Sequence, residues 1–210
     1  MAIPSLALFL ITSLVLLLTP GPAVLYIMAR SLNQGRRAGL VSAMGLGVGT
    51  LIHVAAAALG ISALLSSSAF AFNTIKYAGA AYLIYLGIRK LLSKEEGLQA
   101  GEVPHQSLPN IFYQGVFVNL LNPKLALFFL AFLPQFISAR SGPVPSQILS
   151  LGLLFVAMAI TTDSLYALLT GTVGNWLKSR LHFSRTQHYL TASVFIGLGL
   201  VTALTGSSKK

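Results

Sequence analysis

The sequence predicts an all-α integral membrane protein of about six transmembrane helices, arranged as two inverted three-helix repeats whose first helices are broken by proline. Two observations support this prediction. The 210 residues are 55% hydrophobic and only 9% charged, whereas soluble globular chains carry roughly 25% charged residues. In addition, proline interrupts the opening apolar segment of each half of the chain.

The composition limits both the domain count and the chemistry. A bilayer core requires about 20 apolar residues per helix, so residues 1–210 are expected to form a single transmembrane transporter domain. The chain has no cysteine, which excludes disulfides and thiolate metal sites. The formal net charge of +10 does not indicate nucleic-acid binding, because the charges lie between apolar segments, where topology signals belong.

The first expected repeat covers residues 1–92. Its opening span begins at Ile3 and is interrupted by the sequence Thr19-Pro20-Gly21-Pro22. The spans expected in this half are residues 3–28, 38–65 and 74–92.

A polar stretch at 93–109 is expected to be the one long loop, and the second repeat covers 110–206. Asn122 and Pro123 interrupt its opening span. The basic, amphipathic segment 176–188 is expected to lie at the membrane interface. The spans expected in this half are residues 111–137, 148–173 and 189–204.

The distribution of Lys and Arg predicts that both termini lie outside the cell. This orientation places the larger group of basic residues in the cytoplasmic loops, as the positive-inside rule requires. That group is Arg30, Arg36, Arg37, Arg89, Lys90, Lys94, Lys178, Arg180 and Arg185, against Lys76, Arg140, Lys209 and Lys210 on the other side.

The two proline interruptions predict a binding site between the halves. Proline has no N–H and crowds the carbonyl four residues earlier, and in hydrocarbon the freed groups must be bound by protein, water or ligand. The helix start after each break carries partial positive charge, which suits a carboxylate. Paired breaks of this kind are typical of transporters with inverted repeats, although a packing kink explains either break alone.

Few ionisable residues lie within the expected spans. Asp163 is the only acidic residue outside the polar stretch, and an intramembrane carboxylate usually marks an ion path or a substrate site. Lys124 could pair with Asp163, meet a substrate carboxylate or extend to the headgroups. Tyr166, on the same helical face as Asp163, is expected to orient that carboxylate or to pack in the core. His53 is a candidate proton relay, or a hydrogen-bonded packing residue.

The spacing of Gly45 and Gly49 is the small-xxx-small pattern of close helix contacts. It predicts packing within the chain first and a homodimer second.

Five segments together resemble the LysE/RhtB family of amino-acid exporters, and the resemblance covers nearly the whole chain. It implies an exporter of the bacterial cytoplasmic (inner) membrane, driven by the proton gradient, with no cofactor. The Thr-Pro-Gly-Pro form favours a neutral, homoserine- or threonine-like substrate. The segments are residues 18–22, 45–53, 76–88, 118–124 and 128–136.

The predicted mechanism holds a zwitterionic amino acid near the midplane, with its carboxylate at the two helix starts and Lys124 and its ammonium at Asp163. Protonation of Asp163 on the outer side releases the substrate, and His53 relays the proton inward. The expected substrate-binding residues are Thr19, Pro20, Gly21, Pro22, Asn119, Asn122, Pro123, Lys124, Asp163 and Tyr166; Asp163 and His53 couple the proton.

Two alternatives remain open. The first is an exporter of another small solute or of a cation, although divalent cations need several carboxylates and soft metals need thiolates. The second is an intramembrane enzyme with His53 and Asp163 as acid and base. The chain supplies neither paired carboxylates nor a His-rich ligand set, so neither a catalytic nor a metal site is expected. The expected partners are the amino-acid substrate, protons and the lipid bilayer.

Overall fold

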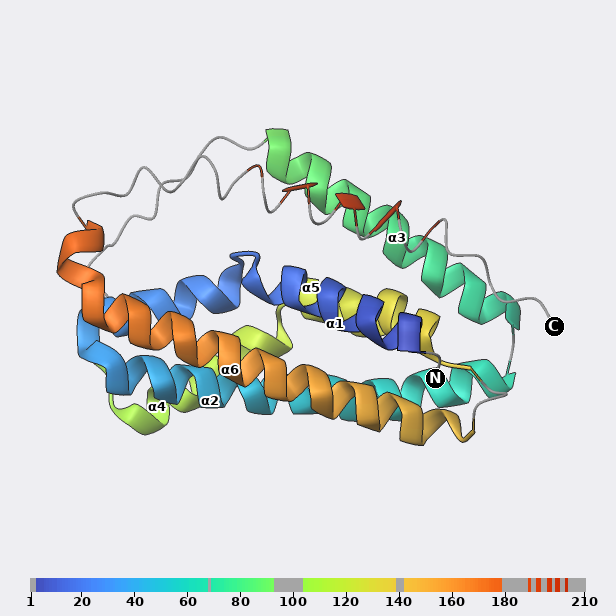
Figure 1. The fold of residues 1–210 in the computed structure, drawn as a ribbon, viewed down its shortest axis with the longest axis horizontal. Coiled ribbons are helices and arrows are strands. Elements are labelled where there is room, and N and C mark those ends of the chain that lie inside the picture. Colours follow the sequence, from blue (N-terminus) through green and yellow to red (C-terminus); the bar gives the residue numbers. More distant parts are fainter. Residues whose placement is uncertain are drawn as a thin grey trace.

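The protein is described by a computed structural model in which all regular elements are helical (Figure 1). The described residues are 3–67, 69–92, 104–138 and 142–178, with the single positions 189, 192, 193, 196, 197, 199, 200 and 203. The predicted interfacial segment beyond residue 178, half of the sixth predicted span and most of the polar stretch therefore lie outside the described residues.

The described part of the chain contains six α-helices. In chain order they are α1 (Ile3–Leu18), α2 (Pro22–Ser67), α3 (Ala69–Leu92), α4 (Leu108–Leu120), α5 (Pro123–Leu127) and α6 (Val144–Lys178). After α5 the chain continues as a π-helical turn over Phe128–Phe132 and a 3₁₀ turn over Leu133–Phe136.

Both predicted proline breaks are confirmed. Between α1 and α2 the chain leaves the helix at Leu18 and re-enters it at Pro22, and between α4 and α5 it does so at Leu120 and Pro123. Proline at the first helical position lacks only an N–H that would have no helical partner there. The second pair is bent by 46° at its break.

Gly35 divides α2 into two helices that run in opposite directions (Figure 1). Its φ of 80° lies in the left-handed region, which glycine adopts without steric cost. The first part of α2 therefore continues the direction of α1, and the second part returns along it.

Within the described residues, two helical stretches are long and apolar enough to cross a membrane, Pro22–Gly60 and Val144–Thr172. The bent pair Leu108–Leu120 and Pro123–Phe136 would make a third span. Shorter apolar helices cover Leu6–Leu18 and Ala80–Arg89. The helical membrane class is thus confirmed, and the six-span inverted repeat stays a prediction.

Glycines bring α2 and α4 into close contact. A Cβ on Gly45 would overlap the carbonyl oxygen of Phe112, and one on Gly49 would lie 2.7 Å from the Cβ of Asn119 and 2.9 Å from the carbonyl oxygen of Val116. The small-xxx-small spacing therefore packs within the chain, as predicted first. The homodimer stays a prediction.

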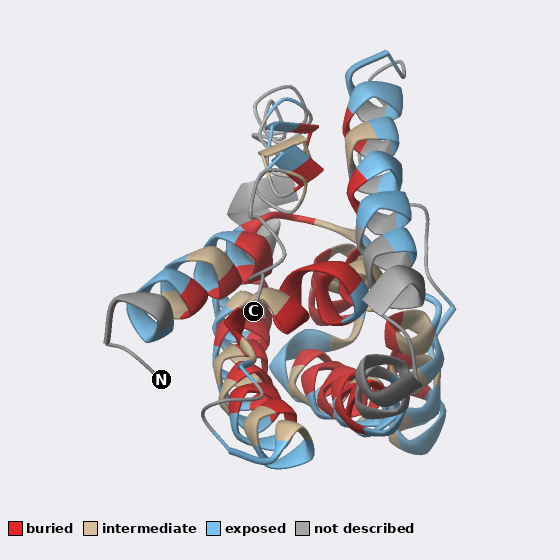
Figure 2. Cartoon of the chain, turned by 90° about the vertical axis from the view of Figure 1, so that its right-hand side faces the viewer, coloured by how far each residue is buried: buried red, intermediate tan, exposed pale blue. Residues whose placement is uncertain are grey.

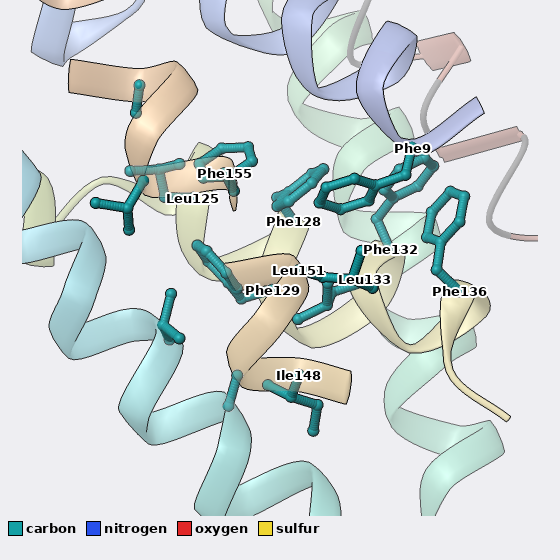
Figure 3. Close-up of a cluster of buried hydrophobic side chains, with 14 of the residues drawn as sticks. Phe9, Leu125, Phe128, Phe129, Phe132, Leu133, Phe136, Ile148, Leu151 and Phe155 are labelled. Atoms are coloured by element: carbon teal, nitrogen blue, oxygen red, sulfur yellow. The ribbon is translucent and has the colours of Figure 1, made fainter. Parts of the chain in front are cut away.

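A cluster of buried phenylalanines fills the bundle between α1, the turns after α5, and α6 (Figure 3). The ring of Phe9 lies 5.3 Å from that of Phe136, centroid to centroid, and Phe128 stacks on Phe155 at 4.6 Å. Buried residues lie on the inward faces of the helices (Figure 2). The members are Phe9, Phe128, Phe129, Phe132, Phe136 and Phe155.

The two broken elements run antiparallel. The helix before the first break contacts the turns that follow the second break, through Phe9 and Phe136. The helix after the first break contacts the helix before the second, through the hydrogen bond from Tyr26 Oη to the carbonyl of Ile111. The breaks are therefore adjacent, with the phenylalanine cluster on one side of them.

The glycine contact yields a stability prediction. Gly49→Ala should lower the free energy of unfolding by about 1–3 kcal/mol, because the backbone oxygen of Val116 cannot move aside easily. The measurement is the unfolding temperature of the purified protein, which should fall. Gly60→Ala, on the same helix with nothing within 4 Å of the new Cβ, is the matched control and should not destabilise, since alanine favours helix over glycine. Equal unfolding temperatures for the two variants would contradict the close packing.

Candidate functional site

Side chains from the second half of the chain bind the carbonyls of the first break. Pro22 has no N–H, so the carbonyl of Leu18 loses its helical partner. The hydroxyl of Tyr166 donates a hydrogen bond to this oxygen at 2.8 Å. The next carbonyl, of Thr19, accepts a hydrogen bond from Nζ of Lys124 at 2.7 Å. Side chains of α5 and α6 thus satisfy the two free carbonyls of the first break.

The second break is closed in the same way from the first half. Pro123 frees the carbonyl of Asn119, which accepts hydrogen bonds from the N–H of Asn122 at 3.0 Å and from Nε2 of His53 at 3.1 Å. A carbonyl only accepts, so Nε2 of His53 carries the hydrogen in this contact. The ring also stacks on Phe129. The candidate relay therefore lies at the break.

Two asparagines order the start of α5. Asn122 is its N-cap, and its Oδ1 accepts a hydrogen bond from the backbone N–H of Lys124 at 3.1 Å, the usual role of a capping residue. Asn119 is buried and donates through Nδ2 to the carbonyl of Leu46 and, at 2.7 Å, to the hydroxyl of Thr50. Its Oδ1 is buried and has no hydrogen-bond partner, so an acceptor is available beside the break.

Asp163 and Lys124 are a buried pair of opposite charges without direct contact. They are 7% and 6% exposed, and each acts electrostatically on the other. Among the described residues no hydrogen bond reaches the Asp163 carboxylate, whereas the Lys124 ammonium is bound to the carbonyl of Thr19. A buried carboxylate in this state is balanced by a nearby cation or neutralised by a proton.

The remaining predicted residues divide between side-chain and backbone roles. Tyr166 lies close enough to feel the charge of Asp163, yet its hydroxyl proton is directed at Leu18. Gly21 faces Lys124, and a Cβ there would lie 3.6 Å from Cδ of that lysine. Thr19 and Pro20 are buried, while Pro22 and Pro123 are exposed and act only by opening the helix.

The structure therefore brings most of the predicted residues together at the two breaks. Within the part of the chain that is described, no group of three His, Cys, Asp or Glu residues could hold a metal ion. Sequence reasoning did not predict that Arg30 is buried and hydrogen-bonded, because it used this residue only as a topology signal. The signal that could have found it is the four-residue spacing of Tyr26, Arg30 and Gln34, which places three polar groups on one helical face.

Comparison with known proteins identifies the family. Residues 14–206 match the family described as LysE type translocator. The chain belongs to this family. Accordingly, this member of the LysE type translocators is a multi-pass membrane protein of a solute-efflux family, and transport rather than catalysis is the family's activity.

Individual relatives agree with this placement. A homoserine/homoserine lactone efflux protein of Salmonella typhimurium is 36% identical over 170 residues, 81% of this chain and 82% of the relative. An uncharacterized membrane protein of Vibrio cholerae is 34% identical over 93% of this chain and 94% of its own. One from Bacillus subtilis is 29% identical over 96% and 99% respectively. No solved structure matches the chain significantly.

The hydrogen bond from Tyr166 to the first break can be tested by removing one atom. Tyr166→Phe leaves the carbonyl of Leu18 without this donor, which should destabilise the protein by about 0.5–1.5 kcal/mol. Tyr113→Phe, at an exposed tyrosine of α4, is the matched control and should leave the unfolding temperature unchanged. If Tyr166→Phe unfolds at the wild-type temperature, the proposed closure of the break by this hydroxyl is wrong.

Proposed function

We propose that the protein exports amino acids or their close derivatives across the cytoplasmic membrane in exchange for protons. The observation that carries the proposal is the buried Asp163–Lys124 pair beside two adjacent proline breaks, in a chain of a translocator family. The name of the Salmonella relative favours a neutral, homoserine-like substrate.

A zwitterionic amino acid carries one positive and one negative charge. These complement Asp163 and Lys124, which form no direct ion pair with each other. Its ammonium binds the carboxylate of Asp163, which has no hydrogen bond among the described residues. Its carboxylate binds Lys124 and faces the helix starts at Pro22 and Pro123, where the helix dipole favours an anion. At α5 the dipole acts alone, because Asn122 already caps the N–H of Lys124. Asn119 contributes a free acceptor oxygen for the ammonium. Binding between charged groups and broken helices is a recurrent design of secondary transporters.

Proton exchange follows from the chemistry of Asp163. When its carboxylate takes up a proton from the outer side, it loses its charge and its attraction for the substrate ammonium, so the substrate leaves. The proton is then released to the cytoplasm, with His53 as relay, because its Nε2–H already points at the second break. The competition of one carboxylate for a proton and an ammonium couples the two movements.

The proposed orientation places the Gly35 turn in the cytoplasm and both termini outside. The exposed Arg36 and Arg37 lie next to that turn, as the positive-inside rule expects. The antiparallel course of the two broken elements supports the inverted three-helix repeats, because an odd number of crossings inverts the second copy.

The first experiment is efflux from proteoliposomes loaded with a panel of labelled amino acids, with and without an imposed proton gradient. Selective, gradient-dependent loss of one chemical class is the expected result. If correctly folded protein releases no amino acid faster than empty vesicles do, amino-acid export is wrong. Product formation by purified protein in detergent would instead support the intramembrane enzyme.

Replacing the membrane carboxylate should separate folding from coupling. Asp163→Asn removes the titrating group, so export should lose its response to the proton gradient while the unfolding temperature stays near that of the wild type. Glu96→Gln, which removes a carboxylate from the polar stretch, is the control and should retain the response. Undiminished gradient-driven export by Asp163→Asn would disprove the coupling role.

The relay role of His53 has its own test. Glutamine can donate a hydrogen bond to the carbonyl of Asn119 but does not titrate, so His53→Gln should preserve the break and slow proton-driven export. The measurement is the initial export rate over a range of external pH. A wild-type pH profile in this variant would show that His53 is a packing residue only.

A further inference from the structure

Arg30 is a buried cation held by neutral groups. It is 4% exposed and lies in the first part of α2. Its Nη1 donates to Oε1 of Gln34 and to the carbonyl of Pro104, both at 3.1 Å. Its Nη2 donates to Oε1 of Gln106 and of Gln114, both at 2.9 Å. No partner among the described residues is acidic.

These bonds satisfy the hydrogens of the guanidinium but not its charge. The guanidinium stays protonated in proteins, and its planar fork matches a carboxylate bidentately. Among the described residues, only neutral acceptors contact this desolvated charge, and neutral acceptors do not balance it. In addition, the Nε–H of Arg30 is buried and has no hydrogen-bond partner. Within the described part of the chain, Arg30 therefore provides an unused donor and a positive charge, both of which favour an anion.

Arg30 lies on a polar face that begins at the first break. Tyr26, Arg30 and Gln34 follow Pro22 at four-residue spacing, and this face meets α4, where the hydroxyl of Tyr26 donates to the carbonyl of Ile111. The guanidinium lies 5.7 Å from the centre of the Tyr26 ring. On the opposite side of the breaks the phenylalanine cluster offers no polar group. This polar face thus extends along α2 from the first break toward the Gly35 turn.

We propose that Arg30 forms a second carboxylate-binding subsite, which takes up the carboxylate of the substrate between the Gly35 end and the Asp163–Lys124 pair. The inference rests on the proposed function and extends it. Without substrate, the glutamine oxygens occupy the fork of the guanidinium. A substrate carboxylate replaces them, binds bidentately and balances the charge, and it passes on to Lys124.

Homoserine and its lactone provide the direct test, because the lactone keeps the ammonium but has no free carboxylate. Export of both is measured in proteoliposomes for wild type and Arg30→Gln. The half-saturating concentration of homoserine should rise about tenfold or more, the effect of losing charge-assisted hydrogen bonds. The half-saturating concentration of the lactone should stay within about twofold of the wild-type value. An equal rise for both compounds, or no rise for either, would overturn the subsite.

Two further variants guard against a purely structural effect. Arg30→Lys keeps the charge but loses the fork, so the selective effect on homoserine should be smaller than in Arg30→Gln. If Arg30→Gln does not fold, Arg30→Lys decides: equal effects on acid and lactone overturn the proposal. Glu102→Gln should leave the ratio of the two compounds unchanged. If this variant instead reproduces Arg30→Gln, that carboxylate occupies the arginine and the substrate subsite is wrong.

A binding measurement separates this proposal from the proposed function. If wild type exports neither compound, homoserine export is wrong. The carboxylate subsite is then tested separately, by comparing propionate, which has a carboxylate, with propionamide, which has none, as stabilisers of the purified protein. Propionate alone should raise the unfolding temperature of wild type and of Lys124→Gln, which lacks the other buried cation, but not that of Arg30→Gln. No stabilisation of the wild type, or retained stabilisation of Arg30→Gln, would overturn the carboxylate subsite.

Discussion

The backbone carbonyls that proline frees inside the bundle constrain the rest of the structure. In hydrocarbon each such oxygen must find a donor, and at the first break the donors are Tyr166 and Lys124. At the second break the donor across the bundle is His53. Each half of the chain therefore donates hydrogen bonds to the freed carbonyls in the break of the other half. These hydrogen bonds require the two breaks to lie next to each other.

The hydrogen bonds across the breaks also determine how the charged side chains interact with one another. Because the ammonium of Lys124 is held by the carbonyl of Thr19, it does not form a direct ion pair with Asp163, although the two lie close enough to interact. The Asp163 carboxylate is consequently buried and without a hydrogen bond among the described residues. This arrangement, with a cation nearby and unbonded oxygens, is the feature on which the proposed binding of a proton or an ammonium group at Asp163 rests.

The surroundings of the site differ on its two sides. Phe9, Phe128 and Phe136 fill one side with apolar packing, which excludes water and charged solutes. Tyr26, Arg30 and Gln34 line the other with polar groups that face α4. The first side offers no polar group to a solute, whereas the second carries hydrogen-bonding groups and the charge of Arg30.

The sequence alone determined the membrane class, the two breaks and the short inventory of charges within the spans, because hydrophobic length and the missing N–H of proline act locally. It also indicated the glycine contact, since the four-residue spacing of Gly45 and Gly49 belongs to one helix face. Only the tertiary structure decided which donor meets which freed carbonyl, that Tyr166 binds Leu18, and that Arg30 is buried. These contacts join residues about 70 to 150 positions apart, and no local pattern specifies a partner at that separation.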